Sequence, residues 1–260
     1  MENTQVKKLT LGGLMIALVF VTTFSIKIPI PFTQGYIHAG DSMIFIAAIL
    51  LGWKYGAIAG GVGSALADIL GGYANWALPT LIIKTIMGAL VGWIAKDAKE
   101  NESSKNKVIL SIVMAIVWFG FSNILRMTVS NSIAANSTRL IGEVEGVATI
   151  NDLLMLSEKL QNQLLWASIL IPLIIILLSI YLSRFNKKVF TVNQLLGMLI
   201  AGLWMVSGYY VAAGIMYGNF IVPIFSIPWN IVQFVMGLVI AYFVILTLLK
   251  TPIIRYLQKE

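Results

Sequence analysis

The chain has 260 residues, of which 58% are hydrophobic and only 11% charged, and its net charge is +7. Soluble domains carry roughly 25% charged residues, so these charges are too few to cover a water-facing surface. The lack of cysteine excludes disulfides and cysteine metal sites, and a single histidine excludes a multi-histidine metal site within one chain. Composition therefore predicts an all-α, polytopic membrane helix bundle, for which we expect no cofactor and no metal.

Apolar segments follow one another along the chain, and a membrane-crossing helix needs about 20 such residues. We predict eight spans, over 9–28, 41–53, 55–72, 79–95, 108–128, 166–184, 194–217 and 225–249. The first is interpreted as a membrane helix and not as a cleaved signal. The second is short and separated from the third only by Lys54, so we expect a tight hairpin. One long helix over 41–72 is the alternative, which five glycines disfavour.

Positive charges predict the orientation, because cytoplasmic loops are enriched in Lys and Arg. We predict a multi-pass protein of the cell (plasma) membrane with both termini in the cytoplasm. In this orientation, the inner loops and termini hold most of the Lys and Arg residues. The inner set is Lys7, Lys8, Lys54, Lys96, Lys99, Lys105, Lys107, Arg184, Lys187, Lys188, Lys250, Arg255 and Lys259. This distribution explains the net charge without a nucleic-acid partner.

The middle of the chain separates two groups of spans. We divide the chain into 1–95 with four helices, an insertion over 96–193, and 194–260 with two helices and a cytoplasmic tail. In the insertion, 96–107 is predicted to be a charged cytoplasmic linker. Residues 130–165 are predicted to be external, with a short amphipathic helix on the outer surface.

Ionisable groups inside a bilayer are costly, so each one is a functional hypothesis. Asp41, Asp68 and Lys84 lie in the second, third and fourth predicted spans, and His38 precedes the first of them. The predicted orientation places all four at a similar depth in the outer half of the membrane. This pattern favours a substrate pocket that opens to the outside.

Simpler roles remain open for the same residues. Asp68 and Lys84 could neutralise each other as a buried structural pair. His38 could bond to a loop carbonyl at the interface. Asp41 could cap the helix that starts beside it, by accepting hydrogen bonds from the amides of Met43 or Ile44.

Two predicted external loops combine Gly, Pro and aromatic residues. Tyr36 lies in the first loop, and Tyr73, Asn75 and Trp76 lie in the second. The rings could stack on a heteroaromatic ligand, and the Asn amide offers a donor and an acceptor. An aromatic belt at the membrane interface is the alternative. The joint pattern in both loops favours substrate binding by these four residues.

The last span carries two amides on one helix face. Asn230 and Gln233 are three residues apart and follow Pro228. In lipid they must face protein or a cavity. We assign them to the substrate site, with a hydrogen bond to a neighbouring helix as the alternative.

Small residues four apart let another helix approach closely. Gly13 and Ala17 form such a pair near the cytoplasmic end of the first span, where a partner could dock. Two further pairs occur, Gly56 with Gly60 and Gly88 with Gly92.

Several of these segments together resemble the substrate-capture (S) components of energy-coupling-factor (ECF) vitamin transporters, over about 1–95 and 194–250. The segments are Tyr36–Asp41 (YIHAGD), Gly52–Ala57 (GWKYGA), Gly60–Asp68 (GGVGSALAD), Ile83–Lys84 with Gly88, and Ile227–Asn230 (IPWN) with Gln233. The resemblance is to the branch with hydroxymethylpyrimidine, pyridoxine and cobalamin carriers.

The resemblance implies a capture subunit that binds a water-soluble vitamin or precursor from outside. Delivery inward would need an ECF T component, docked on Gly13 and Ala17, and two cytoplasmic ATPase subunits. The chain has no GxxxxGK[ST] motif of its own, so partners would hydrolyse the ATP. The implied core has six helices, which leaves two inserted helices in 96–193 without a role.

Other function classes are weighed against this one. A stand-alone ion-coupled transporter could use Asp68 and Lys84 without partners. A membrane enzyme is not expected, since there is no HExxH or GxSxG motif. A structural protein would bind no ligand.

Overall fold

The computed structural model describes residues 2–30, 35–96, 104–144, 147–185 and 191–248. Each of the eight predicted spans corresponds to a helix. These are α1 (Glu2–Ser25), α2 (Gly40–Leu51), α3 (Trp53–Leu70), α4 (Ala77–Lys96), α5 (Ser104–Ala135), α7 (Ile150–Phe185), α8 (Val192–Tyr217) and α9 (Ile227–Leu248). The all-α membrane bundle predicted from composition is confirmed.

Six of these helices are long and apolar enough to cross a membrane by themselves: α1, α4, α5, α7, α8 and α9. The helix α2 has only 12 residues, about 18 Å at 1.5 Å per residue, which is shorter than the hydrocarbon core of about 30 Å. It nevertheless packs inside the bundle, against α1, α3, α4 and α9. The short span predicted at 41–53 therefore exists as a buried helix that is too short to cross the membrane by itself.

The break between α2 and α3 lies at Gly52. Its φ of 86° is a conformation that residues with a side chain rarely adopt. Lys54, which the sequence suggested as the separator, belongs to α3 instead. The predicted hairpin is confirmed, because α2 and α3 pack against each other.

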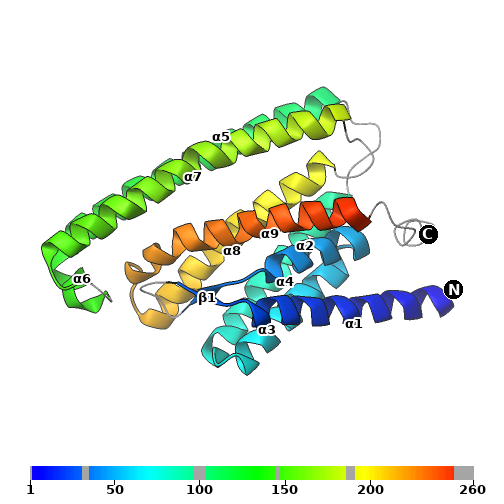
Figure 1. Ribbon diagram of the computed structural model, residues 1–260, viewed down its shortest axis with the longest axis horizontal. Coiled ribbons are helices and arrows are strands. Elements are labelled where there is room, and N and C mark those ends of the chain that lie inside the picture. Colours follow the sequence, from blue (N-terminus) through cyan, green and yellow to red (C-terminus); the bar gives the residue numbers. More distant parts are fainter. Residues whose placement is uncertain (1, 31–34, 97–103, 145–146, 186–190, 249–260) are drawn as a thin grey trace.

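Three short elements, one pair of strands and two 3₁₀ turns, connect the helices at the end of the bundle away from the start of α1. The strands β1 (Ile28–Pro29) and β2 (Tyr36–Ile37) pair antiparallel, with Ile28 opposite Ile37. The 3₁₀ turns η1 (Ala74–Trp76) and η2 (Val222–Ser226) precede α4 and α9. All three lie at the left in Figure 1, whereas α1 begins and α9 ends at the right.

The helices α3 and α4 approach each other through glycine. A methyl group at Gly88 would overlap the backbone of Gly56, and one at Gly92 would overlap Trp53. A methyl at Gly60 would fall only 2.8 Å from the carbonyl oxygen of Lys84. The two glycine pairs of these helices therefore serve packing within the chain, and they hold the backbone of α4 close to α3.

The middle of the chain forms a long helical hairpin. The helices α5 and α7 have 32 and 36 residues and run side by side, with α6 (Ser137–Glu143) at the tip (Figure 1). A short helix, α6, does lie within the predicted segment 130–165, but residues 150–165 belong to α7, which continues through the predicted span at 166–184. At 1.5 Å per residue α7 is about 54 Å long, which exceeds the hydrocarbon thickness. The hairpin therefore extends beyond the membrane core.

The hairpin packs on α8 and α9, whereas α1 packs on α2 and α3 at the other side of the bundle (Figure 1). Trp118 of α5 is almost fully buried and contacts the ring of Phe234 in α9, with centroids 5.5 Å apart. Its Nε1 donates to the carbonyl of Ala167 in α7 at 3.3 Å. This side chain therefore joins both helices of the hairpin to the bundle. Of the predicted inner loops and tail, residues 97–103, 186–190 and 249–260 lie outside the described part of the chain.

Candidate functional site

A cavity lies among the connecting elements at the end of the bundle that holds β1, β2, η1 and η2. Its empty volume is about 530 Å³, which includes open solvent at its mouth. Its walls come from α3, α4, α8, α9 and the three short elements. The lining residues are Ile30, Gly35, Tyr36, His38, Asp68, Trp76, Thr80, Tyr209, Ala213, Tyr217, Ser226, Asn230 and Gln233.

One wall is aromatic. Gly72, with a φ of 87°, turns the chain after α3, and the amide of Tyr73 then donates to the carbonyl of Asp68 at 2.8 Å. This turn directs Trp76 inward, where it is 8% exposed. The Trp76 ring lies 6.0 Å from that of Tyr209 and 6.2 Å, edge-on, from that of Tyr217. Three rings from η1 and α8 therefore face one side of the cavity.

Tyr36 and Asp68 join β2 to α3. The Tyr36 hydroxyl donates to Asp68 Oδ1 at 2.6 Å, and the two rings of Tyr36 and Tyr73 lie 4.6 Å apart. Burial and the adjacent carboxylate of Asp68 raise the pKa of Tyr36 well above its ordinary value. The hydroxyl therefore stays protonated and acts as the donor.

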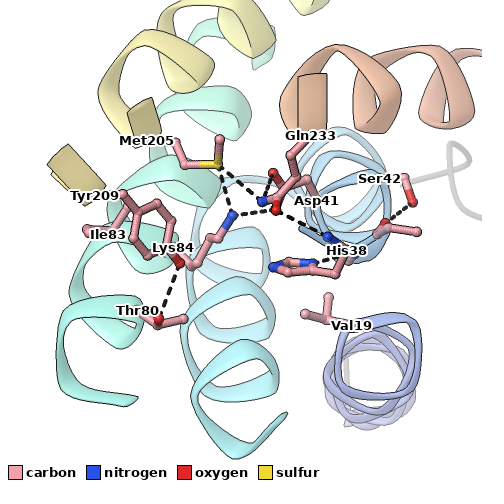
Figure 2. Close-up of polar contacts among 12 residues, drawn as sticks. Val19, His38, Asp41, Ser42, Thr80, Ile83, Lys84, Met205, Tyr209 and Gln233 are labelled. Carbon is pink, nitrogen blue, oxygen red and sulfur yellow. Dashed lines mark hydrogen bonds and ion pairs between the residues drawn. The ribbon is translucent and has the colours of Figure 1, made fainter. Parts of the chain in front are cut away.

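A buried network lies behind the cavity (Figure 2). The Lys84 ammonium forms an ion pair with Asp41, and both side chains are fully buried. Gln233 Nε2 donates to the other carboxylate oxygen of Asp41 at 2.9 Å, and Lys84 Nζ also lies 3.0 Å from Met205 Sδ. Four helices, α2, α4, α8 and α9, thus meet at one neutral polar cluster.

This network corrects two interpretations of the sequence. Lys84 pairs with Asp41 and not with Asp68, because α2 also packs against α4 and places Asp41 beside the lysine. The cap hypothesis for Asp41 is also wrong. The helix α2 has Ala39 at its N-cap without a side-chain hydrogen bond, and the Asp41 carboxylate accepts from Lys84 and Gln233.

Two hydrogen bonds hold His38, one from a backbone amide and one to a side chain. Its Nδ1 accepts from the Gly40 amide at 3.0 Å, and its own amide donates to Gln233 Oε1 at 3.2 Å. Among the described residues, the His38 ring donates to no loop carbonyl, which was the alternative role. Burial lowers the pKa of His38 to about 3, so the ring is neutral. Because Nδ1 is an acceptor, the hydrogen lies on Nε2.

The predicted site residues divide into three groups. Tyr36, His38, Asp68, Trp76, Asn230 and Gln233 line the cavity. Asp41 and Lys84 lie behind its wall: Asp41 contacts the lining residue Gln233, and the Lys84 Nζ lies 5.3 Å from the ring centre of Tyr209. The Tyr73 ring packs at a tilt against Tyr36, Asn75 is exposed, and neither is among the residues that line the cavity.

The sequence interpretation missed Thr80, Tyr209, Tyr217 and Ser226. The Tyr209 hydroxyl donates to Thr80 Oγ1 at 3.2 Å, which joins α8 to α4 (Figure 2). Tyr209, Ala213 and Tyr217 recur every four residues and therefore share one face of α8. Ser226 stands four residues before Asn230 in the same way. These spacings were present in the sequence, but an apolar helix with tyrosines is equally typical of lipid contact.

The predicted docking pair lies on the outer face of α1. Gly13 and Ala17 are both exposed, and a methyl group at Gly13 would meet nothing within 4 Å. The neighbouring Gly12 instead faces the Tyr55 ring of α3. The small-residue surface of α1 is thus directed away from the chain, unlike the glycine pairs of α3 and α4.

Together these features define a multi-pass membrane protein with an enclosed, mixed aromatic and polar cavity. Residues 3–157 match the model of the family described as "ECF-type riboflavin transporter, S component". Because the match spans more than half of the 260 residues, the chain belongs to this family of vitamin-transporter S components.

Two relatives share the sequence over shorter stretches. A protein of Pyrococcus woesei described as "Uncharacterized protein in gap 3'region" is 55% identical over 96 residues, 37% of this chain and 62% of its own length. The thiamine precursor transporter HmpT of Lactococcus lactis subsp. cremoris (strain MG1363) is 38% identical over 93 residues, 35% of this chain and 56% of its own length. The chain therefore spans less than two thirds of either relative.

Proposed function

We propose that this chain is the membrane-embedded capture subunit of an ATP-driven ECF importer. It binds a water-soluble vitamin or vitamin precursor from outside and delivers it inward with partner subunits. The observation that carries this proposal is the enclosed cavity of a family S component, lined by Trp76, Tyr209 and Tyr217 on one side and by Asp68 and Asn230 on others.

The orientation follows from the ends of the bundle. The cavity lies at the end opposite the start of α1 and the end of α9 (Figure 1). Most Lys and Arg residues belong to the loops and termini at those helix ends, and such charges favour the cytoplasmic side. With both termini on the cytoplasmic side of the plasma membrane, the cavity opens to the outside of the cell.

The substrate class is a hydroxymethylpyrimidine- or pyridoxine-like heterocycle. Flat aromatic walls suit a ring of that size, and the similar HmpT is described as a thiamine precursor transporter. Trp76, Tyr36, His38, Asp68, Asn230 and Gln233 are the proposed contacts from the sequence, with Tyr209 and Tyr217 added from the cavity.

The partners are an ECF T component and two cytoplasmic ATPase subunits. The exposed face of α1 around Gly13 and Ala17 supports a docking surface for a membrane helix of the T component. The α5–α7 hairpin packs on α8 and α9, so it leaves the α1 face open.

Two measurements test the function. Native mass spectrometry of the purified full chain should reveal a co-purified vitamin or precursor. In liposomes, uptake of that compound should require the T component, the ATPases and ATP. Uptake by the chain alone under a proton gradient would instead establish the stand-alone ion-coupled transporter. A protein that binds no vitamin at all would overturn the capture function.

A further inference from the structure

The charges around the cavity are unbalanced. Asp68 is the one acidic residue among the lining residues, and no lysine or arginine is among them. The Asp68 side chain is buried, with 4% exposed. It accepts hydrogen bonds from the Tyr36 hydroxyl, at 2.6 Å, and from Thr80, and both donors are neutral. The cavity therefore holds a carboxyl group that has no salt-bridge partner within the described residues.

The two nearby lysines are engaged elsewhere. Lys84 forms its ion pair with Asp41 behind the wall. Lys27 lies outside the cavity, with its Nζ 3.4 Å from the carbonyl of Gly71 and 5.3 Å from the centre of the Tyr36 ring. Neither lysine forms a salt bridge with Asp68 in the described part of the chain.

The remaining polar side chains of the cavity differ in how many hydrogen bonds they already form within the protein. Gln233 donates to Asp41 and accepts from the His38 amide, so its amide is committed to the network. Asn230 makes only one long hydrogen bond among the described residues, 3.5 Å from its Nδ2 to Ser226 Oγ. Asp68 and Asn230 are consequently the cavity groups with the most capacity for a ligand.

We propose, building on the capture function above, that the cavity selects an unphosphorylated aromatic nitrogen heterocycle that presents an amino or protonated ring N–H group to Asp68. The aromatic walls hold the ring, and Asn230 contacts a second polar group of the ligand. An anionic ligand is rejected, because its charge would meet a buried carboxylate with no lining cation to offset it.

The selectivity should be large enough to measure. A hydrogen bond to a charged group contributes more than one between neutral groups. The bond to the charged group corresponds to about 10- to 100-fold in affinity. Sites built to bond a ligand N–H discriminate strongly against analogues without it, since their buried acceptor is left unpaired. Replacing the amino group by an oxo group should therefore weaken binding at least about 10-fold.

The experiment uses isothermal titration of the purified full chain with three probes. These are 4-amino-5-hydroxymethyl-2-methylpyrimidine, its 4-oxo analogue and its phosphate ester. The wild type is compared with Asp68→Asn and with Glu158→Gln. The control removes an exposed carboxylate of α7 that lies away from the cavity.

The expected result is a preference for the amino compound over the oxo compound and the ester in the wild type and in Glu158→Gln. Asp68→Asn should lose most of that preference. Should Asp68→Asn fail to fold, the wild-type amino-to-oxo ratio decides by itself. Equal affinities in the wild type, an unchanged preference in Asp68→Asn, or tight binding of the ester would overturn this assignment and leave the capture function standing. A chain that binds no vitamin in the mass-spectrometry test would overturn the capture function itself.

Discussion

The Lys84 ammonium of α4 lies against the Asp41 carboxylate of α2, and neither side chain reaches solvent. Gln233 completes the contact from α9 and is the one member of this trio that also lines the cavity. The ion pair thus supports the site from behind, and its role is positional. Together with Gln233, it joins the short helix α2 to α4 and α9, which are both long and apolar enough to cross a membrane.

Breaking the Asp41–Lys84 pair on one side should destabilise the fold. We expect Lys84→Met to lower the free energy of unfolding by about 3–5 kcal/mol, because the Asp41 charge is left buried and unpaired. Chemical unfolding in detergent measures this. The double variant Asp41→Asn/Lys84→Met should recover much of the loss, and Lys159→Met, at an exposed position of α7, should have little effect. A double variant as unstable as the single one would contradict the prediction.

The Tyr36 hydroxyl should contribute to ligand binding through Asp68. In Tyr36→Phe the carboxyl group loses its 2.6 Å hydrogen bond, so its position in the cavity is less defined. We expect ligand affinity to fall by about 10-fold, as for a hydrogen bond to a charged group. Tyr73→Phe is the matched control, because that ring stacks outside the cavity. An equal loss in both variants would indicate a general effect of the outer loops.

Replacing glycine should impair folding on α4 but only partner association on α1. Gly88→Leu forces α3 and α4 apart, since a methyl group there already overlaps Gly56, and we expect loss of folded protein in size-exclusion chromatography. Gly13→Leu, on the exposed face of α1, should fold and bind ligand normally. It should lose association with the T component in a pull-down. Normal transport by Gly13→Leu with all partner subunits would exclude α1 as the docking face.

Trp118 should determine how firmly the α5–α7 hairpin is attached. Truncation of a buried tryptophan costs about 3–5 kcal/mol, and Trp118→Ala also removes the contact with Phe234. We expect faster hydrogen exchange in α5 and α7 than in α3 and α4. Trp166→Ala removes a largely exposed ring from α7 and serves as the control. Uniformly faster exchange across all helices would contradict a local role.

His38 should make stability depend on pH in one direction. Its folded-state pKa is lowered to about 3, whereas the unfolded value is roughly 6.5. The contribution of neutral His38 is therefore fully present above about pH 6.5 and falls as the unfolded chain takes up a proton below it. Denaturant unfolding between pH 7.5 and 5 should show a steeper loss for the wild type than for His38→Asn. Parallel curves would contradict the assignment, because the remaining acidic groups titrate in both proteins.

The sequence by itself determined the number and order of the helices. Lipid requires that backbone groups bond internally, so each long apolar segment had to become a helix. Ionisable residues are rare in such segments, which is why His38, Asp41, Asp68 and Lys84 stood out and why their common depth could be inferred. The continuous α7 was missed, since polar residues over 150–165 are compatible with both a surface helix and a helix that extends beyond the membrane.

Only the tertiary structure decided which polar groups meet. Lys84 could reach a carboxylate from either α2 or α3, and helix rotation together with the packing of α2 against α4 selected Asp41. The same rotation turned Tyr209 and Tyr217 into the cavity, although tyrosines on an apolar helix fit lipid contact equally well. Hydropathy reports how deep a residue lies, but not which way it faces around the helix axis. The direction is set by packing against neighbours far away in the sequence, and that packing left Asp68 as the acidic group of the cavity.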